Sequence, residues 1–533
     1  MDDLNANIAA RLEEGAARTP TRAAIVEAGG VRLTFGELAE RVATLAAGLE
    51  ARGLQPGDRV LLFVPMSADL YVALLAVLHL GAVAVFVDAW AGRARLDAAV
   101  HAARPRAFLG TAKSHLLRVV SPALRAVPIA LVAHSPGFPL ARWMRREGVR
   151  EAAPVAADSP ALVTFTTGST GRPKAASRSH GFLWAQHEAL ARELAPRSDD
   201  VDMPTLPVFV LNNLALGIPS VLPDFDPRRP ADIDPARVHA QMRREGVTTT
   251  SGSPAFYERL AEWCEARGER LRVRALFTGG APVMRPLARR LAAVTEGAVH
   301  VVYGSTEVEP IAQIEAGEMD EAMSDGRMPG LCVGTPTPGL ALRLVRPHDE
   351  PITLGPGGLA EWDVPDSEVG EVVVSGAHVL PGYLDDAESD RAQKIHEGNR
   401  VWHRTGDGAW RDPRGRLWLM GRVRHRVRRA GATWWGTAAE VRALRVDGIR
   451  HAAYLGLPDD RLGQRAVLCV ERAQGGMNAS IERSLREALA EIPVDEIRSL
   501  SIPRDPRHAS KSDLDRLRAL LGTGPRRRPE TTA

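Results

Sequence analysis

Residues 166–174 read Thr-Thr-Gly-Ser-Thr-Gly-Arg-Pro-Lys, and this stretch decides how the rest of the chain is interpreted. The apolar residues 161–165 come directly before it and are typical of a buried strand that delivers the chain into a loop. Its two glycines let the backbone approach a ligand closely, its hydroxyl groups can donate hydrogen bonds, and the ammonium of Lys174 adds positive charge. Such a loop can bind a polyphosphate, although an ordinary polar turn has a similar composition. It is not a Walker A loop, because two residues separate its second glycine from Lys174 and no Ser or Thr follows directly.

Three further polar stretches follow in a fixed order. Residues 303–307 read Tyr-Gly-Ser-Thr-Glu, residues 403–407 read His-Arg-Thr-Gly-Asp with Gly421-Arg422 after them, and residues 507–511 read Arg-His-Ala-Ser-Lys. Together with the first loop, in this order and at these separations, they resemble the adenylate-forming superfamily of acyl-CoA synthetases, nonribosomal-peptide adenylation domains and luciferases. The resemblance runs from about residue 5 to about residue 520.

The alternation of apolar segments predicts an α/β fold. Residues 59–64 are expected to form a strand, 68–80 a helix that stops at Gly81, and 82–87 a buried strand, and this pattern repeats to about residue 300, as in parallel βαβ units. Residues 330–420 are richer in Gly and Pro and lose their helical pattern, which favours a small β-rich subdomain.

We therefore expect a large N-terminal domain of two βα-layered subdomains plus the small β-rich subdomain, followed by a small mobile α+β C-terminal domain. The predicted ranges are 1–421 for the AMP-binding (adenylation) domain, 422–523 for the mobile domain that carries the catalytic lysine, and 524–533 for a disordered tail.

Bulk properties narrow the class of protein. The 533 residues are too many for one ordinary core, and 45% hydrophobic with 25% charged residues is typical of a globular protein. A net charge of +3, spread along the chain, gives no indication of nucleic-acid binding. The longest apolar run, residues 72–87, is shorter than the ~20 residues that span a bilayer. The acidic first residues do not resemble a signal peptide, and three scattered cysteines fit a reducing compartment, so we expect a cytoplasmic protein.

The resemblance implies an ATP site. Residues 166–174 would cover the phosphates, residues 279–282 would lie beside adenine, Tyr303 would stack on adenine, and Asp407 would accept the ribose hydroxyls beside Arg422. The full set implied to contact ATP or AMP is Thr166, Thr167, Gly168, Ser169, Thr170, Gly171, Lys174, Gly279, Gly280, Ala281, Pro282, Tyr303, Gly304, Ser305, Asp407 and Arg422.

The resemblance also implies the catalytic groups. Lys511 would bridge the carboxylate and the α-phosphate, Thr306 would contact phosphate, and Glu307 would bind Mg²⁺, because a carboxylate is a hard ligand for a hard cation. Arg424 occupies the hinge position about which the small domain would rotate between two half-reactions. Only four of the 68 basic residues are lysines (Lys113, Lys174, Lys394 and Lys511), and two of these fall in the motifs.

The acid is expected to be apolar. Val210, Ser251, Gly252 and Phe256 are predicted to line the acyl pocket, and Val210 stands where many relatives have a histidine. Residues 205–213 carry no acidic side chain that would pair with the ammonium of an amino acid.

Several stretches, at residues 207–217, 223–226, 421–427 and 505–508, resemble the β-lactone synthetases of bacterial olefin biosynthesis. Those enzymes adenylate a long-chain β-hydroxy acid, whose own hydroxyl displaces AMP without CoA. The expected activity is ATP- and Mg²⁺-dependent adenylation of a fatty or β-hydroxy fatty acid, followed by ligation as in acyl-CoA ligases, with CoA as a possible acceptor. β-Lactone closure is the alternative, and a catalytically inactive nucleotide-binding protein is the alternative of another class. Association with other enzymes of a lipid or natural-product pathway stays open.

The pair Trp434-Trp435 departs from the pattern of the superfamily. These rings would either narrow the passage for the pantetheine arm of CoA or bury area where two domains meet.

Overall fold

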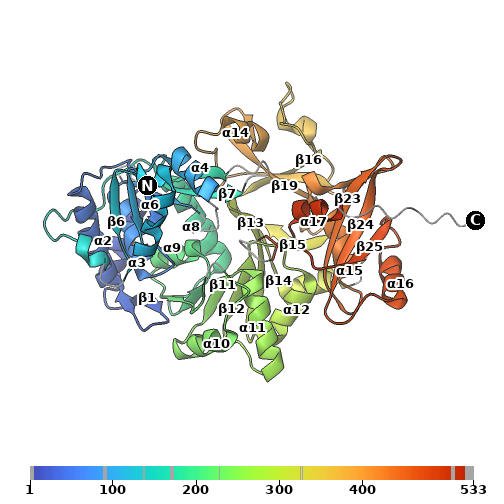
Figure 1. Cartoon of the computed structure of the whole chain (residues 1–533), viewed down its shortest axis with the longest axis horizontal. Helices are drawn as coiled ribbons and strands as arrows, with labels where there is room; N and C mark the ends of the chain where they lie inside the picture. Colours follow the sequence, from blue (N-terminus) through green and yellow to red (C-terminus); the bar gives the residue numbers. More distant parts are fainter. Residues whose placement is uncertain are drawn as a thin grey trace, which may run out of the picture.

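The computed structural model describes residues 5–87, 93–135, 139–167, 173–226, 229–324, 326, 328–505 and 510–522. Two large sheets with their helices follow each other along the chain and end in a small domain, from blue through green and yellow to red in Figure 1. Within these described ranges, no helix has the length and apolar character needed to cross a membrane.

The first sheet has the strand order β6-β5-β3-β4-β7-β8 and is parallel up to the β7–β8 hairpin. Its strands are β3 (Arg59–Phe63), β4 (Val83–Phe86), β5 (Ala107–Gly110), β6 (Ile129–Val132), β7 (Pro160–Thr167) and β8 (Pro173–Ser179). The helical segments between them are α3 (Ala68–His79), α4 (Arg93–Ala103), α5 (Ala112–His115), α6 (Leu117–Val120), α7 (Pro122–Arg125) and the 3-10 turn η1 (Leu140–Trp143). Because β7 and β8 pair as a hairpin, they fix both ends of the predicted phosphate loop.

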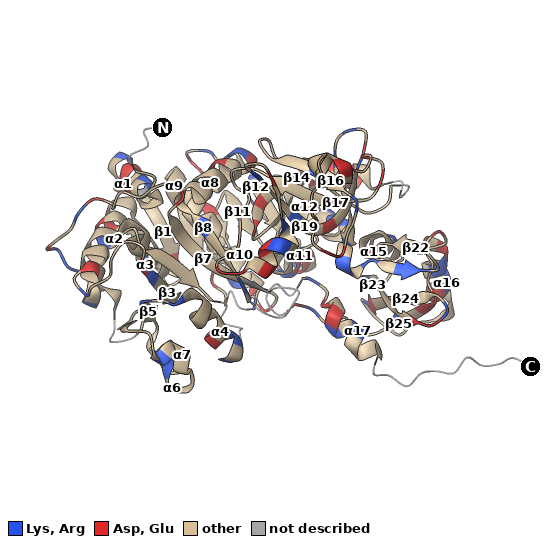
Figure 2. Cartoon of the chain, turned by 90° about the horizontal axis from the view of Figure 1, so that it is seen from above, with Lys and Arg blue, Asp and Glu red and all other residues tan. Residues whose placement is uncertain are grey.

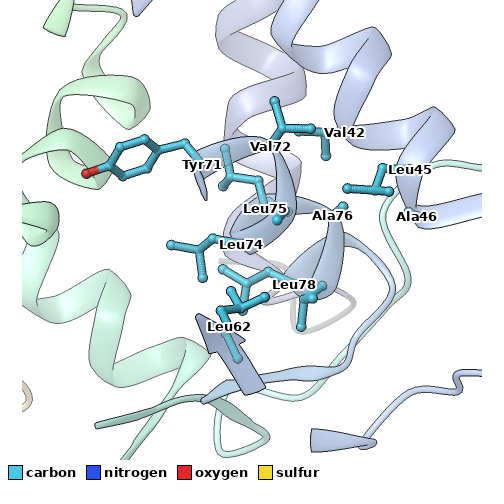
Figure 3. Packing of buried hydrophobic residues seen from close by; sticks show 14 of the residues in the cluster. Val42, Leu45, Ala46, Leu62, Tyr71, Val72, Leu74, Leu75, Ala76 and Leu78 are labelled. Carbon is cyan, nitrogen blue, oxygen red and sulfur yellow. The ribbon is translucent and has the colours of Figure 1, made fainter. Parts of the chain in front are cut away.

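Helix α3 is the centre of the first core. Its residues are apolar on every face, as expected of a helix covered on all sides. Figure 3 shows Val72, Leu75 and Ala76 of α3 facing Val42 and Leu45 of α2 (Phe35–Glu50). Helix α2 begins with a capping box, in which the side chains of Thr34 and Glu37 bind each other's backbone N–H groups. The predicted helix, Gly81 stop and strand are confirmed.

The second sheet runs β16-β17-β19-β20-β15-β14-β13-β12-β11-β9-β10-β1-β2, with β18 paired to β19. Its strands are β1 (Ala23–Glu27), β2 (Arg32–Thr34), β9 (Asp202–Pro204), β10 (Ser220–Leu222), β11 (Thr249–Gly252), β12 (Ala275–Gly279), β13 (Ala298–Ser305), β14 (Val308–Glu315), β15 (Leu331–Pro336), β16 (Ala341–Val345), β17 (Gly370–Ser375), β18 (Lys394–Glu397), β19 (Arg400–Arg411) and β20 (Leu417–Arg422). Its helical segments, with the N-terminal α1, are α1 (Ile8–Arg18), α8 (His180–Leu194), α9 (Pro207–Leu216), α10 (Pro235–Arg244), α11 (Pro254–Arg267), α12 (Arg285–Val294), α13 (Ala316–Ala322), α14 (Ala387–Gln393) and η2 (Gly358–Trp362).

The predicted β-rich region is confirmed, and the structure shows two further features of it. Strand β15 pairs with both β14 and β20, so this region continues the second sheet and does not form a sheet of its own. It also contains the short helix α14, which begins where the side chain of Asp386 accepts a hydrogen bond from the N–H of Ser389. The mixed α/β architecture itself is confirmed.

The small domain begins after η3 (Val423–His425) and is built on the three-stranded sheet β23-β24-β25. Its elements are β21 (Val427–Arg429), β22 (Ala432–Trp434), α15 (Gly436–Ala443), β23 (Ile449–Asp459), β24 (Gly463–Arg472), α16 (Ala479–Ala488), β25 (Glu496–Ser499) and α17 (Leu514–Gly522). The boundary at 421/422 stays a prediction, and the tail predicted at 524–533 lies outside the described residues.

Apolar and charged contacts join the small domain to the second sheet. The ring of Trp435 packs so closely on Gly408 of β19 that a Cβ there would lie 2.3 Å from it. Arg450 of β23 forms ion pairs with Glu258 (3.3 Å) and Glu262 (2.7 Å) of α11. Trp435 therefore buries area where the domains meet. In Figure 2, Lys and Arg residues (blue) and Asp and Glu residues (red) are interspersed along the chain, in agreement with its dispersed charge.

Candidate active site

A cavity of about 2320 Å³ lies where the two large sheets and the small domain meet. The predicted site residues that line it are Lys174, Gly280, Ala281, Pro282, Tyr303, Gly304, Ser305, Thr306, Glu307, Asp407, Arg422, Arg424 and Lys511. These residues come from distant parts of the sequence, so the fold brings most of the predicted set into one space. Gly279 does not line the cavity; its α-carbon lies against the carbonyl of Val302, where a Cβ would come within 2.5 Å.

At one end of the cavity, Tyr303 of β13, Asp407 of β19 and Arg422 of β20 contact one another. The hydroxyl of Tyr303 donates a hydrogen bond to Oδ2 of Asp407 (2.8 Å), and Nε of Arg422 lies 3.1 Å from Oδ1 of the same carboxylate. The Arg422 guanidinium also donates to the carbonyl of Thr405 (2.9 Å). The charge of Asp407 raises the pKa of Arg422, so the guanidinium stays charged. A fixed carboxylate beside a flat aromatic ring suits a ribose and a purine.

Glu307 lies at the turn between β13 and β14, and its carboxylate is held from one side. The hydroxyl of Tyr383 donates to Oε1 of Glu307 (2.9 Å). Burial opposes ionisation, but His403, the Tyr383 hydrogen bond and the ammonium of Lys394 together keep the pKa of Glu307 below its ordinary value. The carboxylate is therefore available as an anion that faces the cavity.

Two of the four lysines lie beside the same tyrosine. Nζ of Lys174 is 5.5 Å and Nζ of Lys394 is 5.3 Å from the centre of the Tyr383 ring. Burial lowers the pKa of Lys394 to about 8, and Nζ of Lys394 lies 3.2 Å from Nδ1 of His403. Burial also lowers the pKa of Lys174, partly offset by the charge of Glu307. This cluster concentrates positive charge next to the Glu307 carboxylate.

A third group of charges lies around the same turn. The buried Arg178 of β8 donates to Oγ1 of Thr164 (2.8 Å) and to the carbonyl of Thr306 (2.7 Å). Glu309 of β14 lines the cavity; burial raises its pKa to about 7, against the charges of Arg178 and Lys511. Lys511 of the small domain therefore acts electrostatically at the Thr306–Glu309 turn of the large domain.

The cavity also has an apolar part. Its apolar walls include Leu70, Leu74, Phe86, Leu162, Leu183, Val208 and Leu211, from α3, β4, β7, α8 and α9. None of the four predicted acyl-pocket residues is among the cavity-lining residues: Val210 and Phe256 are fully buried in apolar clusters, and Ser251 and Gly252 lie in the interior of the sheet. Val210 is absent from the cavity lining because of its position on the helix. Val208 and Leu211 share the face of α9 that lies toward the cavity, and Val210 lies on another face.

The predicted phosphate loop is only partly described. Gly168, Ser169, Thr170 and Gly171 lie outside the described residues, and the backbone of Thr166 and Thr167 forms the end of β7. Their contacts with phosphate stay predictions.

Sequence reasoning missed Arg178, Glu309, Tyr383, Lys394 and His403 as members of this site. Glu309 could have been suspected because it is a charged residue between the apolar Val308 and Pro310, and Lys394 because lysine is rare in this chain. Tyr383 had none, because only the folded chain brings it to Glu307.

Comparisons with known proteins agree with this geometry. A family model described as AMP-binding enzyme matches residues 12–384. The chain is 32% identical to the olefin beta-lactone synthetase of Stenotrophomonas maltophilia (strain K279a), over 96% of this chain and 97% of that protein. It is 33% identical to the protein of the same name from Xanthomonas campestris pv. campestris, over 94% of this chain and 93% of that protein. The crystal structure of ATP-bound MatB from Rhodopseudomonas palustris superimposes with a TM-score of 0.80, at 24% identity, over 97% of this chain and 99% of that chain, which shows the shared fold. The chain therefore belongs to the AMP-binding enzyme family and is an adenylate-forming ligase.

Proposed function

We propose that this ligase activates a hydrophobic 3-hydroxy acid as its adenylate and then closes a β-lactone with release of AMP, without CoA. The observation that carries the proposal is the similarity, over nearly the full length of both chains, to two olefin beta-lactone synthetases. The apolar part of the cavity supports an acid with a hydrocarbon chain.

In the first half-reaction, a carboxylate oxygen of the acid bonds to the α-phosphorus of ATP, and the bond to pyrophosphate breaks. Negative charge gathers on the phosphoryl oxygens, so donors fixed around that position accelerate the step. Lys511 and Thr306 are proposed to donate there, while Lys174 neutralises the leaving pyrophosphate. Tyr303, Asp407 and Arg422 would hold the adenosine.

The family implies a Mg²⁺ ion, and the donor set fits one. Mg²⁺ is commonly held by one or two carboxylates together with substrate phosphates and water. Glu307 offers an ionised carboxylate that Tyr383 orients toward the cavity. Across the described residues no group of three or more His, Cys, Asp and Glu side chains gathers as a metal cage. When bound, the ion would neutralise phosphate charge, with Glu307 as its protein ligand.

In the second half-reaction, the 3-hydroxyl oxygen of the acid attacks its own activated carbonyl carbon. The new C–O bond closes a four-membered ring, the bond from the carbonyl to the AMP phosphate breaks, and the hydroxyl proton passes to water. No other acceptor is required.

The tryptophan pair gives no reason to exclude CoA. Trp435 packs on Gly408, and neither Trp434 nor Trp435 is among the residues that line the cavity. Thioester formation is therefore the competing outcome that an experiment must separate from lactone closure.

The test is mass spectrometry of the products from ATP, Mg²⁺ and matched saturated and 3-hydroxy fatty acids, each with and without CoA. We expect the β-lactone and AMP from the 3-hydroxy acid in both conditions. A thioester as the main product whenever CoA is present would overturn the proposal and place the enzyme with the CoA ligases.

A further inference from the structure

Glu309 is a charged residue in a place where an apolar acid would bind. It lies on β14, two positions after Glu307, between the fully buried Val308 and Ile311. Its side chain passes beside Gly304: a Cβ added to this glycine would lie 3.2 Å from Cγ of Glu309. The glycine therefore leaves room for the Glu309 side chain at the cavity wall. In the part of the chain that the structure describes, no hydrogen bond to the Glu309 carboxylate is found.

The backbone of Glu309 is anchored on the side of the apolar wall. Nε2 of Gln186 on α8 donates to the carbonyl of Glu309 (3.4 Å). Leu183 lies one turn earlier on α8, on the same face as Gln186, and both residues line the cavity. The backbone of Glu309 therefore lies where the apolar wall begins, and its side chain lines the same cavity.

On its other side, Glu309 faces the reacting end of the cavity. The charges of Arg178 and Lys511 both act on its carboxylate. The Arg178 guanidinium is itself fixed to the carbonyl of Thr306, beside the predicted phosphate contact. The carboxylate of a bound acid would lie at Thr306 and Lys511, and its hydrocarbon chain would lie along Leu183. The carbons next to the carboxylate would then lie beside Glu309.

An acceptor at that point suits a hydroxyl donor. An unsubstituted chain would leave a polar group facing methylene, which is unfavourable. A substrate ammonium would meet two fixed cations, whereas a neutral hydroxyl donates to the carboxylate without adding a charge. We propose that Glu309 is a specificity-determining residue that accepts a hydrogen bond from the 3-hydroxyl group of the acid. This inference rests on the proposed function, because it names what selects the 3-hydroxy acid.

The test measures the first-turnover rate of pyrophosphate release, which needs no acceptor, with three acids of equal chain length: unsubstituted, 3-hydroxy and 3-amino. The wild type should prefer the 3-hydroxy acid in kcat/KM. In Glu309→Ala the ratio of 3-hydroxy to unsubstituted acid should fall about tenfold, mainly through a higher KM for the hydroxy acid, because a uniform binding contact is lost. Glu309→Gln keeps an acceptor oxygen and should retain part of the preference.

Glu315→Gln is the matched control, because Glu315 lies on the same strand with an exposed side chain that does not line the cavity, and the ratio should stay at the wild-type value. A wild type that prefers the unsubstituted or the 3-amino acid would overturn the inference, and so would a ratio unchanged in both Glu309 variants. Lactone analysis of the same reactions separates the two proposals. A preference that depends on Glu309 without any lactone would contradict only ring closure, whereas a lactone with an unchanged ratio would contradict only the role of Glu309.

Discussion

At the scale of single residues, the site combines charged side chains with the groups that orient them. The fold brings Glu307, Asp407 and Lys511 to one cavity. Tyr383 orients Glu307 and Arg178 binds the carbonyl of Thr306, and both come from other segments. Pairing across such sequence distances depends on tertiary packing, which local patterns do not record.

Lys511→Ala should reduce adenylate formation by at least about a hundredfold, because a fixed donor at a developing charge is worth that much. ATP should still bind, since Tyr303, Asp407 and Arg422 belong to the large domain. Pyrophosphate release and nucleotide binding measured side by side check this. Lys113→Ala, at an exposed lysine of α5 outside the cavity lining, is the control. Release by Lys511→Ala within about threefold of wild type would remove Lys511 from the reaction.

Glu307→Gln should shift the Mg²⁺ titration of activity to about tenfold higher concentration, because an amide oxygen is a poorer ligand for a hard cation. Calcium-free buffers with varied MgCl₂ at fixed ATP provide the measurement. An unchanged titration together with an unchanged rate would show that Glu307 does not bind the metal.

His180 should make stability depend on pH. Its ring is fully buried, its Nδ1 accepts a hydrogen bond from the N–H of Ile8 (3.2 Å), and burial lowers its pKa to about 4. The fold therefore holds the ring neutral. The free energy of unfolding is highest above the ordinary histidine pKa of about 6.5, and it falls as the pH drops from there toward 4, because the unfolded chain binds a proton that the folded chain does not. Between about pH 7.5 and pH 5.5 this group should lower the free energy of unfolding by about 1 kcal/mol. Urea midpoints of wild type and His180→Phe at both pH values test this, and an equally steep loss in the variant would contradict it.

At the scale of elements, strong local patterns were reliable and helical phase was not. The apolar run that ends at Gly81 predicted a helix that the structure contains. The prediction that Val210 lines the acyl pocket depends on helical phase, and in α9 it is Val208 and Leu211 that line the cavity. The continuation of the second sheet through β15 and β20 also has no local signal, because it depends on pairing between distant strands.

The phase of α9 can be tested through chain length. Leu211 lines the cavity, so Leu211→Phe should fill part of the acyl space and lower kcat/KM for a long-chain acid about tenfold relative to a medium-chain acid. Val210 is fully buried in the first core, so Val210→Phe should overpack it and destabilise the protein by about 1–3 kcal/mol without that change in preference. Steady-state kinetics over a series of acids, with thermal unfolding, distinguish the two. A change in chain-length preference in Val210→Phe, with only a loss of stability in Leu211→Phe, would place Val210 in the pocket and contradict this prediction.

At the scale of the whole molecule, the site depends on two bodies in contact. Lys511 comes from the small domain, and Arg450 and Trp435 hold that domain against α11 and β19. The hinge at Arg424 stays a prediction; its guanidinium lies 3.3 Å from Asp515 of α17. The family resemblance made this division predictable, whereas the contacts that fix it could be read only from the structure.

The central claim is that the substrate supplies its own acceptor, and the amount of AMP released without CoA tests it most directly. With an unsubstituted acid the adenylate has no acceptor, so pyrophosphate release should stop near one equivalent of enzyme and AMP should appear only by slow hydrolysis. With the matched 3-hydroxy acid, ring closure frees the site, and AMP release should continue over many turnovers at a rate that CoA does not change. AMP release near zero with both acids in the absence of CoA, and many turnovers only after CoA is added, would contradict the account.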